Sequence, residues 1–117
     1  MGRLAVGIVL VVLAAGCQSS APVSRADLLA QAQRMTPADP KVAALYGQSC
    51  KQCHTLADSG APLTGDRAGW EARWAKGLPA LVKSTVTGLG GMPPGGQCFS
   101  CSQGDYEALI KFMAGRE

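Results

Sequence analysis

The sequence predicts an all-α fold, and three observations favour this class. No stretch of the chain alternates apolar and polar residues with the period of two that marks a half-buried strand. Four segments instead carry helix start signals or apolar residues at helical spacing. The chain has 117 residues, enough for one small domain and too few for several. We therefore expect a single domain of about four short helices.

The capping residues place these helices in order along the chain. Asp39 is a good N-cap and is followed by Pro40 at the first helical position. Ser102, with Asp105 three residues later, has the pattern of a capping box at the start of the last helix. The four helices are expected at about residues 40–50, 67–77, 79–87 and 103–113.

The composition indicates a domain that needs an extra stabiliser. Only 5% of the residues are aromatic, whereas 15 Gly and 7 Pro indicate much irregular backbone. Domains of this size often rely on disulfides or metals, and the chain contains 5 Cys. The net charge of +3 comes from scattered Lys and Arg without a basic run, so nucleic acid is not expected as a partner.

Residues 1–16 have the pattern of a signal peptide. The apolar run over residues 4–13 is shorter than the roughly 20 residues that span a bilayer. Its end, Ala14-Ala15-Gly16-Cys17, resembles the bacterial lipobox, in which the Cys is acylated and becomes the mature N-terminus. This predicts export and a lipid anchor at Cys17 on the periplasmic side of a bacterial membrane. An ordinary signal peptide with Cys17 as a free thiol is the alternative.

The rest of the chain divides into a tether and a packed domain. Residues 17–38 are expected to form the lipid-anchored tether, because they are rich in Ser, Ala, Gln and Pro. Ser24 and Asp27 resemble a capping box, which favours a short helix within this spacer. Residues 39–117 are expected to form the packed domain.

The segment Cys50-Lys51-Gln52-Cys53-His54 carries the clearest chemistry. The pattern C-x-x-C-H is the attachment signature of c-type haem: each thiol adds to one vinyl group of the porphyrin, and the adjacent imidazole reaches the iron. His54 is the single histidine of the chain. The motif predicts one covalently bound haem c, held by Cys50 and Cys53.

A second C-x-x-C, formed by Cys98 and Cys101, leaves two alternatives open. The four thiols could hold a zinc ion, or the first pair could be a disulfide with an incidental His54. Export to an oxidising compartment favours disulfides over free thiolates. With Cys17 on lipid and the first pair on haem, Cys98 and Cys101 remain as an even pair, for which we predict a local disulfide. A redox-active dithiol is the alternative role for this pair.

The chain from about residue 39 to residue 117 resembles the class I monohaem cytochromes c, most closely the short bacterial cytochrome c-five type. The resemblance rests on the following residues: Tyr46, CKQCH at 50–54, GAP at 60–62, TGD at 64–66, Trp70, and GGMPPGGQC at 90–98 with the C-x-x-C that ends at Cys101. It implies the small class I cytochrome c fold, with short helices wrapped around one haem. It also implies that His54 and Met92 are the axial ligands of the iron and that the carbonyl of Pro62 accepts the other imidazole proton. Tyr46 and Phe112 would contribute to the crossing of the first and last helices.

Met92 is also the best thioether candidate on physical grounds. It lies between two glycines, which permit close backbone approach, and two prolines, which stiffen a loop. An axial Met raises the potential of a haem. The predicted function is one-electron transfer between redox protein partners, without enzymatic turnover. The alternative is a haem module with an open sixth position, suited to peroxide chemistry or gas sensing.

Overall fold

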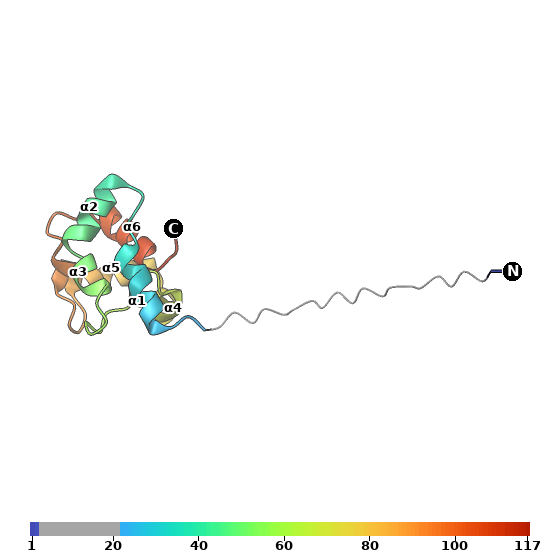
Figure 1. Ribbon diagram of the computed structural model, residues 1–117. Coiled ribbons are helices and arrows are strands. Elements are labelled where there is room, and N and C mark those ends of the chain that lie inside the picture. Colours follow the sequence, from blue (N-terminus) through green and yellow to red (C-terminus); the bar gives the residue numbers. More distant parts are fainter. Residues whose placement is uncertain (3–21) are drawn as a thin grey trace.

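The computed structural model describes residues 1–2 and 22–117, and this part of the chain is all-helical. Its elements are α1 (Arg25–Arg34), α2 (Pro40–Gln48), α3 (Lys51–His54), α4 (Arg67–Trp74), α5 (Leu78–Thr87), the 3-10 helix η1 (Pro94–Gln97) and α6 (Gln103–Met113) (Figure 1). The predicted fold class is confirmed. Cys17 and most of the expected signal peptide lie outside the described residues.

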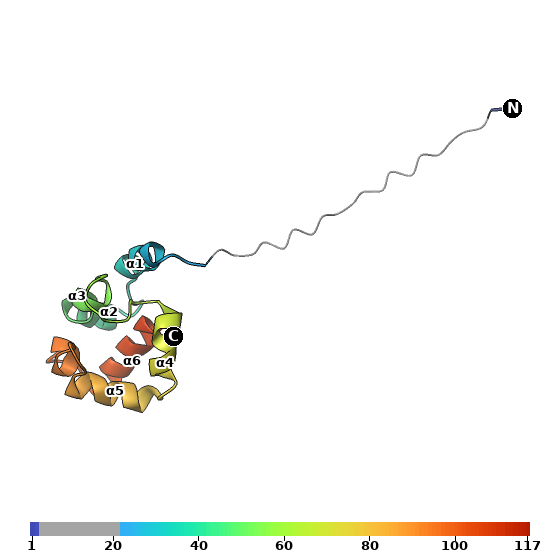
Figure 2. The same cartoon turned by 90° about the horizontal axis from the view of Figure 1, so that it is seen from below.

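Helix α6 lies at the centre of the domain and packs against α2 and α5 (Figure 2). Its start has the predicted capping box: the hydroxyl of Ser102 accepts from the backbone N–H of Asp105, and the carboxylate of Asp105 accepts from the backbone N–H of Ser102. The rings of Tyr46 on α2 and Phe112 on α6 meet edge to face at 5.0 Å. Helices α2 and α6, the first and last helices of the domain, therefore cross as the resemblance implies.

The buried core joins side chains from α2, α4, α5 and α6 with Cys50 at the start of α3 and Ala114 at the end of α6. Its members are Tyr46, Cys50, Trp70, Leu81, Val82, Leu109, Ile110, Phe112, Met113 and Ala114. Few large aromatic side chains contribute, in agreement with the thin core that the composition predicts.

Two helices differ from the sequence expectation. The predicted first helix ends at Gln48, because Ser49 has non-helical dihedral angles, and α3 begins at Lys51 as a separate helix over the haem motif. Helix α1, expected within a spacer, instead packs on the domain. Its Ala32 is fully buried, and the guanidinium of Arg25 donates to the carbonyl of Ala57 at 2.9 Å. Burial of an apolar helix face explains this docking.

The ion pair at the start of α6 leads to a prediction about acid stability. The ammonium of Lys41 lies 2.7 Å from the carboxylate of Asp105 and, with the hydrogen bonds from Ser102, lowers the pKa of Asp105 to about 2. Since the folded pKa lies below the ordinary value of 3.8, the carboxylate stabilises the fold above about pH 4 and loses this contribution as the pH falls toward 2.

We expect the free energy of unfolding of Asp105→Asn to depend less on pH across this window than that of the unaltered protein. Denaturant titrations at several pH values between 5 and 2 measure the difference. Asp58→Asn, at an exposed carboxylate, is the control and should follow the unaltered curve. If the free energy of unfolding depended on pH in the same way for all three proteins, Asp105 would not be the source of the acid sensitivity.

Candidate functional site

His54 is the last residue of α3, and its ring is buried, with only 5% of the residue exposed. Its Nδ1 lies 2.8 Å from the carbonyl oxygen of Pro62. A carbonyl can only accept, so Nδ1 carries the proton and donates it, which leaves the lone pair on Nε2. Burial lowers the pKa of His54, and the charge of Arg73 adds to this effect while the bond to Pro62 opposes it. The site therefore presents a neutral imidazole, the form that binds a metal.

The loop after His54 is fixed by hydrogen bonds that also orient the ring. The backbone N–H of Thr64 donates to the carbonyl of His54 at 2.8 Å, and the hydroxyl of Tyr46 donates to Oγ1 of Thr64 at 2.9 Å. The indole N–H of Trp70 donates to the carbonyl of Leu63 at 2.9 Å. The indole also stacks on the imidazole, with ring centres 5.6 Å apart. The imidazole is thus held in both position and tilt.

Cys50 and Cys53 are free thiols at either end of one helical turn beside His54. Cys50 is buried, and burial raises the pKa of its thiol, whereas Cys53 is exposed. The Sγ of Cys50 lies 3.5 Å from the hydroxyl of Ser49. The two thiols are therefore not joined to each other, and the alternative of a disulfide in the C-x-x-C-H motif is not what the structure shows.

Met92 lies in a tight turn that several glycines permit. Two backbone hydrogen bonds, of 3.1 and 3.0 Å, pair Leu89 with Met92 and close the turn. A Cβ at Gly88 would lie 2.9 Å from the carbonyl oxygen of Met92, and one at Gly96 would lie 3.1 Å from its methyl group. A side chain at Gly88 would force the backbone of the turn to move, whereas one at Gly96 would push against the Met92 methyl group, so the two glycines help to specify how Met92 is held.

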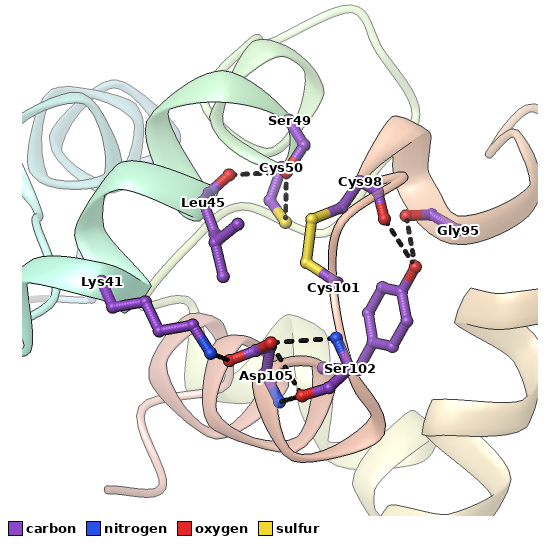
Figure 3. The surroundings of a disulfide bond; sticks show 10 residues. Lys41, Leu45, Ser49, Cys50, Gly95, Cys98, Cys101, Ser102 and Asp105 are labelled. Atoms are coloured by element: carbon purple, nitrogen blue, oxygen red, sulfur yellow. Dashed lines mark hydrogen bonds and ion pairs between the residues drawn. A yellow bond between two sulfur atoms is a disulfide. The ribbon is translucent and has the colours of Figure 1, made fainter.

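Cys98 and Cys101 form a disulfide beside this turn, as the sequence predicts (Figure 3). The hydroxyl of Tyr106 donates to the carbonyls of Gly95 and Cys98, at 3.3 and 3.0 Å, and ties the loop to α6. Among the described residues, no three His, Cys, Asp or Glu side chains are grouped to hold a metal ion. The zinc alternative needed four thiolates and is therefore wrong for this structure, because Cys98 and Cys101 are joined to each other. A disulfide is also the oxidised form of a redox-active dithiol, so this bond does not test the dithiol alternative.

Sequence reasoning missed several of these supporting groups. The sequence pointed to Thr64 only as part of the TGD pattern at 64–66, and it did not single out Tyr106. Neither carries a local sequence signal for its hydrogen bond, because Tyr46 and Thr64 are 18 residues apart and Tyr106 and Gly95 are 11 apart.

The donor set fits a covalently bound haem c. Two free thiols and a neutral buried imidazole come from a single segment, and a thioether comes from a separate, well-supported turn. An all-helical domain built around such a segment defines a small c-type cytochrome of class I.

The chain belongs to the cytochrome family described as "Cytochrome C oxidase, cbb3-type, subunit III", whose model matches residues 37–113. Membership in this family means that the chain carries one covalently bound haem c. The match begins after α1 and covers the domain from α2 to α6.

Curated relatives agree with this assignment. The chain is 33% identical over 73 residues to a cytochrome c5 of Ectopseudomonas mendocina, covering 61% of this chain and 84% of the relative. It is 41% identical over 68 residues to a cytochrome c5 of Azotobacter vinelandii, covering 56% and 82%. A cytochrome c-555 of Chlorobaculum tepidum is 32% identical over 77 residues, covering 62% and 71%. These relatives support a c-type cytochrome that carries electrons.

In the described ranges, 1–2 and 22–117, the helices are too short or too polar for any of them to cross a membrane.

Proposed function

We propose that this chain is a one-electron carrier whose haem is attached through Cys50 and Cys53 and whose iron is held by His54 and Met92. The observation that carries the proposal is the neutral, buried imidazole of His54, fixed by the carbonyl of Pro62 and adjacent to two free thiols. Bound haem supplies the one-electron chemistry of its iron. The residues of the chain attach it, orient its ligands and exclude water.

Electron transfer is favoured over peroxide chemistry or gas sensing by the residues that surround the site. Either alternative needs an open coordination position, and peroxide chemistry also needs a distal acid or base. The chain has no second histidine. Asp66 accepts from the backbone N–H of Gly69 at the start of α4, and Glu71 pairs with Arg116. These carboxylates have structural roles, which supports a carrier and not an enzyme.

A redox titration of the purified holoprotein tests the function. We expect a red protein with a reversible one-electron transition, and an oxidised spectrum with the weak long-wavelength band of an iron–methionine bond. The haem should stay with the denatured polypeptide in acidified organic solvent. A haem that is extracted freely under these conditions would overturn the proposed attachment.

The proposed location is the periplasmic face of a bacterial membrane, with a lipid on Cys17. The apolar run before Ala14-Ala15-Gly16-Cys17 supports this location, since it has the length of a signal peptide and ends in small residues. Two or more acyl chains would give stable anchoring. The partners are redox proteins that reach this face of the membrane.

Replacing Cys17 with alanine is expected to release the cytochrome from the membrane fraction into the soluble periplasm. Fractionation of the producing cells, with haem stain as the readout, measures the change. Ser19→Ala, two residues further along, is the matched control and should stay with the membranes. Release of the unaltered protein would contradict the lipid anchor.

A further inference from the structure

Phe99 is the most exposed large apolar side chain between Val23 and the C-terminus, with 94% of the residue accessible to solvent. It lies between the two cysteines of the disulfide, in the loop that follows η1. An aromatic side chain of this size contributes strongly to a core when buried. Here it lies outside the buried core, although the domain has few aromatic residues.

The backbone that carries Phe99 is held on both sides. Cys98 is buried and is joined to Cys101, and the hydroxyl of Tyr106 donates to the carbonyl of Cys98 (Figure 3). The residue after the disulfide, Ser102, is fixed by the capping box of α6. A loop whose backbone is already fixed in this way has little backbone freedom left to lose when a partner binds it.

The hollow next to Phe99 is lined by uncharged residues. Phe99 borders an open hollow whose other lining residues are Leu45, Gln48, Ser49, Gln97, Cys98 and Ser100. Apolar groups surrounded by amides and hydroxyls are the usual composition of a protein interface, with an apolar centre and a polar rim. A partner matched to this surface offers an uncharged apolar recess with hydrogen-bonding groups around it.

This surface is also close to the redox site. Ser49 lines the hollow, and its hydroxyl lies 3.5 Å from the Sγ of Cys50, one of the two thiols proposed to carry the haem. Electron transfer slows steeply with distance, so a partner seated on Phe99 would be in a favourable place to exchange an electron.

We propose that Phe99 is the docking anchor of this cytochrome, and that its partner is a redox protein with an uncharged apolar recess that takes the phenyl ring. The inference rests on the proposed electron-carrier function. Aromatic anchors of this kind dominate the binding energy of many interfaces, and they lie within a ring of weaker polar contacts.

An electrode with a defined coating tests the anchor. The holoprotein is applied to gold that carries mixed methyl- and hydroxyl-terminated alkanethiols, an uncharged apolar surface, and the interfacial electron-transfer rate is measured. Phe99→Ser should lower this rate about tenfold or more, which is the effect expected for loss of an apolar anchor. Phe99→Leu should restore most of it. Val23→Ser, at an exposed apolar residue outside the domain, should leave the rate unchanged.

A carboxylate-terminated coating separates docking from general damage. On that surface, Phe99→Ser and the unaltered protein should transfer electrons at equal rates. The anchor would be overturned if Phe99→Ser and the unaltered protein transferred electrons at equal rates on the uncharged surface. It would also be overturned if Phe99→Ser lowered the rate by the same factor on both surfaces. If the unaltered protein gives no reversible one-electron wave on either surface, the proposed function itself is wrong. If the unaltered protein gives a reversible wave on the uncharged surface and Phe99→Ser gives the same wave, only the anchor is rejected and the proposed function stands.

Discussion

Replacing Met92 with alanine is expected to make the reduced protein bind carbon monoxide and to lower its reduction potential by more than about 0.1 V. The thioether is proposed to fill one axial position, and axial ligands change haem potentials over about 0.8 V. Its removal leaves that position to water or an added ligand. The rigid turn between Leu89 and Met92 should stay closed, because backbone hydrogen bonds form it. Absorption spectra under carbon monoxide and a redox titration measure both effects.

Met113 provides the matched control for this variant. It is buried in the core on α6, and Met113→Leu conserves most of its volume. This variant should remain unreactive toward carbon monoxide and should keep its potential. Rapid binding of carbon monoxide by the unaltered, folded protein would mean that the sixth position is free, and it would favour the sensor or peroxidase alternative over the carrier.

Replacing both Cys50 and Cys53 with alanine is expected to abolish covalent haem and, with it, the cooperative unfolding transition. The protein core is thin, and burial of a large porphyrin at roughly 25 cal/mol per Å² supplies apolar burial that the side chains lack. Mass spectrometry of the denatured chain measures attachment, and thermal unfolding followed by circular dichroism measures the transition. Each single variant should retain at most one thioether bond.

The second cysteine pair is the control for this experiment. Cys98→Ser with Cys101→Ser should lose the disulfide and keep the full mass of the attached haem, because Ser102, and not histidine, follows Cys101. Haem that stays covalently bound in the Cys50 and Cys53 double variant would contradict the assigned attachment.

The sequence predicts well those contacts whose two interacting groups are close together in the chain. Caps at Asp39 and Ser102 need only a backbone N–H three residues away, and the disulfide joins cysteines three residues apart. The family resemblance also anticipated that the imidazole of His54 bonds to the carbonyl of Pro62. Short-range geometry is fixed by the local backbone, so a sequence pattern is enough to anticipate it.

The contacts that the sequence did not predict join distant segments. The bond between Arg25 and the carbonyl of Ala57 spans 32 residues, and the ion pair of Lys41 and Asp105 spans 64. Such pairs depend on how the helices pack, which no local pattern records. The capping-box pattern of Ser24 and Asp27 indicated a helix at α1 but not the surface on which this helix would lie. Its burial at Ala32 comes from the packed domain, and so it could not be derived from the helix alone.

The docking of α1 changes how far the cytochrome could travel from a membrane. A free tether from Cys17 to residue 38 would let the domain swing over a distance of about 75 Å at 3.3–3.6 Å per residue. With α1 held on the domain, only residues 18–24 separate Cys17 from its first residue, Arg25, a reach of at most about 29 Å. With the proposed lipid in place, one side of the protein would therefore stay close to the bilayer. Its search for partners would be lateral diffusion in two dimensions, among proteins at the same membrane surface.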